Sequence, residues 1–257
     1  MSEHFIEFDK ICIGFGGEPV LKDVSFCVDR GETVVIMGRS GVGKSVSLKI
    51  LMGFLKADSG RVIVEGQDVT AWPEEKFEEL HTRVTMVFQS GALFDSLTVA
   101  ENVAFPLEGK PGWDEEKIAS RVRELLGMLE VEHMAESLPG DLATGTKRAV
   151  AIARALAMDP EAIFYDEPTT MVDPIMAAEV SGLILKLKSS LHKTSIVVTH
   201  DTHLAEKLAD RVVFLHEGRV QFFGPWSEFA ASKDPILQHF LREDELVPAL
   251  DMPPDAN

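Results

Sequence analysis

Residues 38–45 read Gly38-Arg39-Ser40-Gly41-Val42-Gly43-Lys44-Ser45 and fit the pattern G-x-x-x-x-G-K-[ST]. They lie between an apolar run at 34–37, typical of a strand, and a segment at 46–54 typical of a helix. In this setting the glycines let backbone amides surround phosphate oxygens, the lysine reaches the outer phosphates, and the hydroxyl can bind Mg²⁺. The segment therefore predicts a site for a nucleoside triphosphate, with Lys44 on the phosphates, Ser45 on the metal ion and Val46 as the next contact.

The charge of the chain narrows the classes of partner. Its 257 residues include 25 Lys+Arg and 42 Asp+Glu, which gives a net charge of -17. Such acidity suits neither a nucleic-acid backbone nor an anionic lipid surface, so we expect no nucleic-acid partner, and membrane contact only through another protein. No apolar run approaches the length of a spanning helix, and the first four residues lack the features of a signal peptide. We therefore expect a cytosolic protein.

Strand-like and helix-like segments intermix along the chain, which predicts an α/β fold. The interior strands are apolar on both faces, as in parallel sheets. Strands are expected at 5–8, 24–28, 34–37, 61–64, 84–88, 162–165, 195–198, 212–215 and 219–223. The clearest helices are expected at 46–54, 115–129, 147–157 and 174–191. We expect one domain over 4–242, with a core at about 4–88 and 159–225 and a helical lobe at about 89–158. The acidic tail at 243–257 is either disordered or a partner-docking arm.

Two adjacent carboxylates follow the apolar run Ala162-Ile163-Phe164-Tyr165. Asp166 is the predicted magnesium ligand and Glu167 the predicted base, because an acid at the end of an apolar strand can hold Mg²⁺ near a phosphate loop. Two adjacent carboxylates repel each other in a partly dry site unless a bound cation or substrate interacts with them. A solvated turn with two acids is the other interpretation.

Gln89 and His200 follow two further predicted strands. The amide of Gln89 can reach both the magnesium ion and the attacking water. His200 can donate a hydrogen bond to the γ-phosphate and orient Glu167. Alone, neither Gln89 nor His200 would indicate a catalytic site.

Taken in order, the phosphate loop, Gln89, the Asp166-Glu167 pair, Asp173 and His200 resemble the ATPase subunits of ABC transporters over about residues 4–230. The resemblance implies a P-loop NTPase fold with a RecA-like core sheet, an antiparallel β subdomain and an inserted helical subdomain. It also implies ATP and Mg²⁺ as ligands, with Ser45, Gln89 and Asp166 around the metal ion.

The same resemblance implies a head-to-tail dimer of two such chains, with each ATP between the phosphate loop of one and the signature segment of the other. Gln89 matches the family's Q-loop, Asp173 the D-loop and His200 the switch histidine. Phe15 falls where the family stacks an aromatic ring on adenine, and ordinary core packing is the alternative for this residue.

One motif departs from the family. The family's Leu-Ser-Gly-Gly signature reads Leu142-Ala143-Thr144-Gly145 here, so the serine hydroxyl is missing. The resemblance assigns Ala143, Thr144 and Gly145 to the γ-phosphate of the opposite chain's ATP. Loss of one such donor can cost about 10²–10³ in rate, by analogy with oxyanion holes. The side chain of Thr144 either blocks close backbone approach or supplies a substitute hydroxyl.

Within the ABC superfamily, segments 88–107, 165–170 and 234–241 are similar to the ATPases of MCE lipid transporters, including the Mla-type phospholipid system. This finer resemblance implies a motor at the cytoplasmic face of the inner membrane, where its Q-loop region binds an integral permease within a complex that contains an MCE protein. The alternative for Phe88, Leu93, Phe94 and Val99 is packing between the lobes.

We therefore expect ATP hydrolysis that powers lipid transport. Three alternatives remain. A nucleotide-gated scaffold would bind ATP with negligible turnover because Ala143 spoils both composite sites, and a heterodimer would obtain an intact signature from its partner. A soluble translation or repair ATPase is disfavoured by the acidic charge and by the absence of a long coiled-coil insertion.

Overall fold

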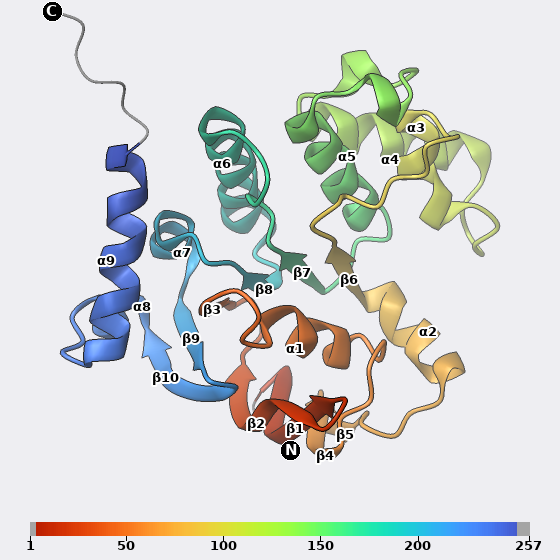
Figure 1. Ribbon diagram of the computed structural model, residues 1–257. Helices are drawn as coiled ribbons and strands as arrows, with labels where there is room; N and C mark the ends of the chain where they lie inside the picture. The colour runs from red at the N-terminus through yellow and green to blue at the C-terminus, as the bar shows by residue number, and fades with distance from the viewer. Residues whose placement is uncertain (1–3, 251–257) are drawn as a thin grey trace, which may run out of the picture.

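The computed structural model describes the backbone of residues 4–250 and the side chains of residues 4–242. A six-stranded sheet of order β10-β9-β3-β8-β7-β6 lies at its centre (Figure 1). The strands β6, β7, β8, β3 and β9 run parallel, and β10 pairs antiparallel with β9. Their bounds are β3 (Thr33–Met37), β6 (Val84–Val87), β7 (Ala162–Asp166), β8 (Thr194–Val198), β9 (Arg211–His216) and β10 (Arg219–Pro225). The interior strands β3, β7 and β8 are buried throughout, as the apolar runs predicted.

A second, antiparallel sheet has the order β2-β1-β4-β5. Its strands are β1 (Ile6–Phe15), β2 (Glu18–Val28), β4 (Ser59–Val64) and β5 (Gln67–Asp68). The strand expected at 5–8 continues to Phe15, because alternate side chains beyond residue 8 are also buried. The β1–β2 hairpin turns at Gly16 and Gly17, whose positive φ angles of 59° and 87° suit glycine.

The helices outside the lobe are α1 (Lys44–Leu51), α2 (Glu74–Arg83), α6 (Pro174–Leu191), α7 (Thr202–Leu208), α8 (Trp226–Ala230) and α9 (Pro235–Leu250). The predicted bounds of α6 are confirmed, whereas α2 was not predicted. Helix α1 begins and ends earlier than the expected 46–54, and Gly53 follows it with a φ of 71°. Helix α9 extends through Leu250, so the proposed start of the tail at 243 falls within a helix. Residues 251–257 of that tail lie outside the described residues.

The helical lobe lies beyond β6 at one end of the six-stranded sheet (Figure 1). It contains α3 (Val99–Ala104), η1 (Phe105–Leu107), α4 (Glu115–Met128), η2 (Glu132–Met134), η3 (Pro139–Asp141) and α5 (Thr144–Leu156). Helix α5 starts at Thr144, three residues before the predicted start. One continuous apolar core joins α3, α4 and α5 to β7 and α6, so the lobe is packed on the rest of the molecule.

A second apolar core lies between the two sheets and encloses α1. Leu48 and Leu51 of α1 pack there with Phe8 of the antiparallel sheet and Ile36 of β3. Because both sheets hold α1, its N-terminus has a fixed place at the carboxyl end of β3. That end carries the phosphate loop.

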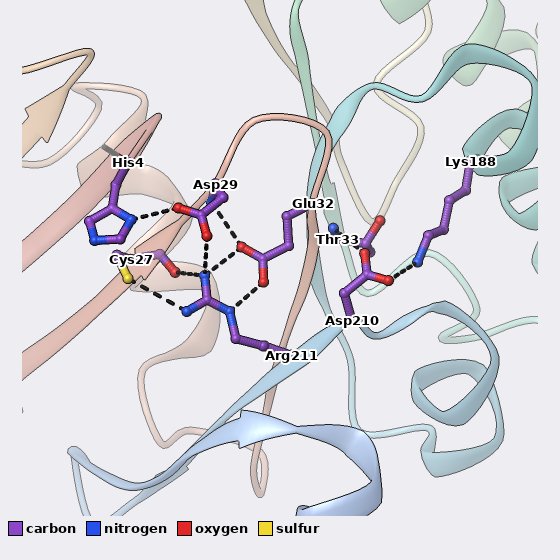
Figure 2. A network of polar contacts seen from close by, with 8 residues as sticks. All are labelled: His4, Cys27, Asp29, Glu32, Thr33, Lys188, Asp210 and Arg211. Atoms are coloured by element: carbon purple, nitrogen blue, oxygen red, sulfur yellow. Dashed lines mark hydrogen bonds and ion pairs between the residues drawn. The ribbon is translucent and has the colours of Figure 1, made fainter. Parts of the chain in front are cut away.

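Polar contacts also join the two sheets. The guanidinium of Arg211, at the start of β9, donates to Glu32 and to the carbonyl of Cys27, and it lies 3.4 Å from Asp29 (Figure 2). A second cluster links Arg30 and Arg83 to both Glu65 and Glu161. In the described part of the chain, no helix has the length and apolar character needed to cross a membrane.

Candidate nucleotide site

The phosphate loop closes around the side chain of Lys44. This ammonium is 5% exposed and donates hydrogen bonds to the carbonyl oxygens of Gly38, at 2.8 Å, and Arg39, at 3.2 Å. Gly38 has a φ of 143°, and a Cβ there would lie 2.4 Å from the carbonyl oxygen of Leu215. Only glycine fits this position without displacement of β9. The close packing of Gly38 against β9 therefore fixes the start of the loop.

Ser45 and Asp166 meet at the predicted metal site. The Ser45 hydroxyl, in the first turn of α1, donates to Oδ1 of Asp166, at the end of β7, over 2.6 Å. Burial raises the pKa of Asp166, although this hydrogen bond opposes the shift. A cation would favour the ionised form. A hydroxyl and one carboxylate fit Mg²⁺, which usually takes its other ligands from substrate phosphates and water.

Glu167 lies among three polar partners. Its carboxylate is 3.2 Å from Nζ of Lys44, accepts a 2.9 Å hydrogen bond from the Thr170 hydroxyl, and lies 2.9 Å from Nδ1 of His200. Burial alone would raise the pKa of Glu167, but the His200 hydrogen bond, the Lys44 charge and the Thr170 hydrogen bond together lower it. Asp166 and Glu167 are 7% and 9% exposed, so the solvated-turn interpretation is wrong.

A cavity of about 260 Å³ opens over these groups. Its lining includes predicted residues from four separate segments: Ser40, Gly41, Gly43, Lys44, Ser45, Val46, Gln89, Glu167 and His200. Val20 and Thr170 also line it and were not predicted. The hydroxyl of Thr170, three residues after Glu167, was the available signal, whereas nothing in the sequence distinguished Val20 from other strand residues.

Phe15 and Asp173 lie apart from that lining. Phe15 is 48% exposed at the end of β1, so the core-packing interpretation is wrong and adenine stacking stays a prediction. Asp173 caps α6 through hydrogen bonds from the backbone N–H groups of Ile175 and Met176, both 3.0 Å long. Its D-loop role also stays a prediction.

The signature segment forms the start of α5. Ala143 is the N-cap residue and makes no side-chain cap hydrogen bond, and both Ala143 and Thr144 are exposed. Gly145 is buried, and a Cβ there would lie 2.1 Å from Cε of Met176 on α6. None of these three residues is part of the lining of this chain's own cavity. The exposed residues Ala143 and Thr144 are therefore available to another molecule.

The sequence profile described as "ABC transporter" matches residues 21–170, more than half of the chain. The chain belongs to the ABC transporter family. Over 243 residues, this ABC ATPase is 32% identical to the "Probable ribonucleotide transport ATP-binding protein mkl" of Mycobacterium tuberculosis, a match that covers 95% of the chain and 68% of that protein. It is also 37% identical to "Protein TRIGALACTOSYLDIACYLGLYCEROL 3, chloroplastic" of Arabidopsis thaliana, over 93% of the chain and 74% of that protein.

The ABC ATPase is similar to solved structures as well. The dimeric ATP-binding cassette MJ0796, in a post-hydrolysis state bound to ADP and Pi, superposes with a TM-score of 0.77 and 31% identity. That match covers 86% of this chain and 98% of the cassette. The predicted fold class is confirmed. The chain is an ATP-binding, ATP-hydrolysing subunit of a transporter, and the family works as a dimer with a membrane permease.

Proposed function

We propose that this ATPase powers the transport of phospholipid or another lipid, in a complex of an integral permease and an MCE lipid-binding protein at the cytoplasmic face of the inner membrane. Two sequence observations support lipid as the cargo. Segments 88–107, 165–170 and 234–241 resemble the MCE-linked ATPases, and one relative carries the name of a galactolipid. Another relative is named for ribonucleotide transport, so the cargo needs a direct test.

The observation that carries the proposal is an aromatic surface formed by residues 88–107. Phe94 and Phe105 are 43% and 47% exposed, and their ring centroids lie 4.6 Å apart. The side chain of Asn102 holds the backbone N–H and carbonyl of Phe94, so the ring is presented by a fixed loop. Aromatic side chains are enriched at protein interfaces, so this pair supports a protein contact here.

A groove of about 420 Å³ lies beside this pair, with Phe88, Phe94, Phe105 and Pro106 in its lining. Phe88 directly precedes Gln89, so a helix bound in the groove would contact the segment that leads into the nucleotide cavity. We assign the groove to the permease. The alternative of packing between lobes applies to Val99, which is fully buried, but not to Phe94.

For hydrolysis, we assign the proton-accepting role to Glu167, which polarises the attacking water. Lys44 balances phosphate charge, His200 contacts the γ-phosphate and holds Glu167, and Gln89 orients the water. Ser45, Asp166 and Gln89 would hold Mg²⁺, which neutralises phosphate charge when bound. The short contacts among Lys44, Glu167 and His200 support these assignments.

A second copy of the chain, or a related subunit, would complete each site head to tail. The exposed start of α5 at Ala143 and Thr144 supports this proposal, because its N–H groups are available for the γ-phosphate of the opposite chain. The missing serine hydroxyl favours an alternative function with little ATP turnover by this chain alone. The chain would then be a nucleotide-gated scaffold or one half of a heterodimer.

The test is purification of the complex through a tag on this chain, followed by reconstitution in vesicles with fluorescent phospholipid. We expect ATP-dependent lipid movement that Glu167→Gln abolishes. The charge-bearing variant Phe94→Glu should lose the permease, whereas Leu138→Glu, at a similarly exposed site in the lobe, should retain it. Copurification of a permease that moves ribonucleotide but no lipid would contradict the cargo assignment.

A further inference from the structure

Arg148 is a buried cation in the signature helix α5. Its side chain is 4% exposed, and burial lowers its pKa. Within residues 4–242, no carboxylate forms an ion pair with it, and its buried Nε has no hydrogen-bond partner. A charge in such surroundings is costly, and an apolar side chain would pack there without that cost. Its position therefore requires an explanation beyond helix packing.

Two backbone carbonyls receive the hydrogen bonds of Arg148. Nη1 donates to the carbonyl oxygen of Phe88 over 3.0 Å, and Nη2 donates to that of Thr170 over 3.3 Å. The Phe88 carbonyl belongs to the peptide bond that leads into Gln89. One planar guanidinium thus touches two of the segments that bring polar side chains to the nucleotide cavity, those of Gln89 and Glu167.

The Thr170 contact leads directly to Glu167. The backbone N–H of Thr170 donates to the carbonyl of Glu167 over 3.2 Å, and its hydroxyl donates to Oε2 of Glu167 over 2.9 Å. Glu167 itself has a φ of 48°, an unfavourable value for a glutamate, so the turn must be held by its surroundings. Arg148 holds the far side of that turn.

We propose that Arg148 is a positioning residue for ATP hydrolysis, which couples the placement of the signature helix to Glu167 through Thr170 and to Gln89 through Phe88. Arg148 lies about one turn after Thr144, so it moves with the signature segment. A shift of α5 that follows contact with the opposite nucleotide would change both hydrogen bonds together. The inference concerns hydrolysis itself and holds whatever the cargo.

Arg154 offers a matched control on the same helix. Its Nη2 donates to the carbonyl oxygens of Gly91, at 3.1 Å, and Ala92, at 2.8 Å, and burial lowers its pKa as well. Neither of these carbonyls belongs to a residue that contacts Glu167. Loss of Arg154 removes a partly buried guanidinium from α5 but leaves the Glu167 turn intact.

The experiment compares kcat and KM for Mg-ATP in the full chain with Arg148→Met and Arg154→Met. We expect Arg148→Met to lower kcat by about tenfold to a hundredfold, the usual cost of a displaced catalytic group, and to leave KM within about twofold. Arg154→Met should leave both values within about twofold. Equal losses of kcat in the two variants would overturn the proposal.

Arg148→Lys tests the proposal if Arg148→Met does not fold. Lysine keeps the charge but lacks the planar fork that reaches both carbonyls, so kcat should still fall. Thr170→Val should lower kcat too, and the double variant should be no slower than the slower single variant, because both act along one path. Losses that multiply, or wild-type kcat in Arg148→Lys, would show a role in stability alone.

Discussion

The phosphate loop leads into helix α1, and the signature segment leads into helix α5. The side chains at these two helix starts differ in the hydrogen bonds and ion pairs that they make. At α1, Lys44 and Ser45 make short contacts with Gly38, Glu167 and Asp166 inside the same chain. At α5, the side chain of the N-cap residue Ala143 makes no hydrogen bond, and both Ala143 and Thr144 are exposed. The phosphate-loop half of the site is therefore preorganised by contacts within the chain, whereas the start of α5, which we propose as the other half, is exposed at Ala143 and Thr144.

The difference follows from which parts of the molecule surround each helix. Helix α1 is enclosed by two sheets, and its N-terminus meets the ends of β7 and β8, so polar side chains from distant segments converge there. Helix α5 packs by its buried face on α3 and α6, and Gly145 at its N-terminus lies against Met176. In the described residues, the side chains of other segments supply its first turn with no hydrogen-bond partners. A head-to-tail dimer would supply them.

The largest expected effect is loss of ATP binding in Lys44→Ala. This change removes the charge that faces the outer phosphates and leaves Glu167 buried without its cation, so affinity should fall by about a hundredfold or more. Lys49→Ala, at an exposed position of the same helix, is the control. Calorimetric titration with ATP measures the affinity of both variants. Unchanged affinity in Lys44→Ala would contradict the assignment of the phosphate loop as a preorganised ATP site.

Glu167→Gln should retain ATP binding and lose turnover. The amide cannot accept the proton that the carboxylate takes from water, so kcat should fall by about 10²–10⁴. Phosphate release by the purified protein measures turnover, and the same variant controls for a contaminating ATPase. Residual turnover close to wild type would exclude Glu167 as the base.

The same contrast explains how far the sequence could predict the site. The residues of the preorganised half lie at strand ends or within two residues of them, as Asp166, Glu167 and His200 do, and the carboxyl ends of parallel strands meet at one edge of a sheet. The apolar strand pattern was therefore enough to bring them together. Arg148 was missed because its hydrogen bonds go to backbone carbonyls, which leave no pattern in the sequence. Thr170 was missed because its contact with Glu167 depends on a turn with positive φ, although its hydroxyl three residues after Glu167 was an available signal.

The sequence also predicted the bounds of some helices and strands better than those of others. Helix α6 was predicted with its bounds because Asp173 and Pro174 give a clear start. The second half of β1 and the first half of β2 were not, because they contain Lys10, Gly14 and Lys22, whose strand conformation depends on pairing in the hairpin. For Phe15 the sequence allowed both adenine stacking and core packing. The exposure of its side chain in the structure excludes core packing.

Ala143→Ser would make the exposed half resemble the preorganised one. A serine N-cap can accept a hydrogen bond from the start of α5, worth about 1 kcal/mol, which would raise Tm by about 2–4 °C in a protein of this size. Turnover should rise by about tenfold or more if the hydroxyl limits it. Ala143→Gly is the control, since glycine supplies most of the capping benefit without a hydroxyl. Equal turnover in all three proteins would show that Thr144 or the backbone suffices.

The smallest effect concerns the ionic cluster that joins the two sheets around the preorganised half. Hydrogen bonds from Arg83 and Arg30 lower the pKa of Glu161 from 4.5 to about 2. A depressed folded-state pKa stabilises the protein above the unfolded value, and this contribution is lost as pH falls from about 4.5 through about 2. Because these side chains are partly exposed, we expect Glu161→Gln to cost less than about 1 kcal/mol at pH 7.

Urea unfolding of the wild type and Glu161→Gln across this pH range measures the difference. It should begin to shrink near pH 4.5 and disappear near pH 2, because only the wild type then loses the ionised partner of Arg30 and Arg83. Glu124→Gln, in the exposed pair with Arg121, is the control and should show a smaller difference throughout. A constant difference between the wild type and Glu161→Gln would mean that the packing of the side chain, and not its charge, holds this junction. The sheets around the phosphate loop would then be joined mainly by their apolar core.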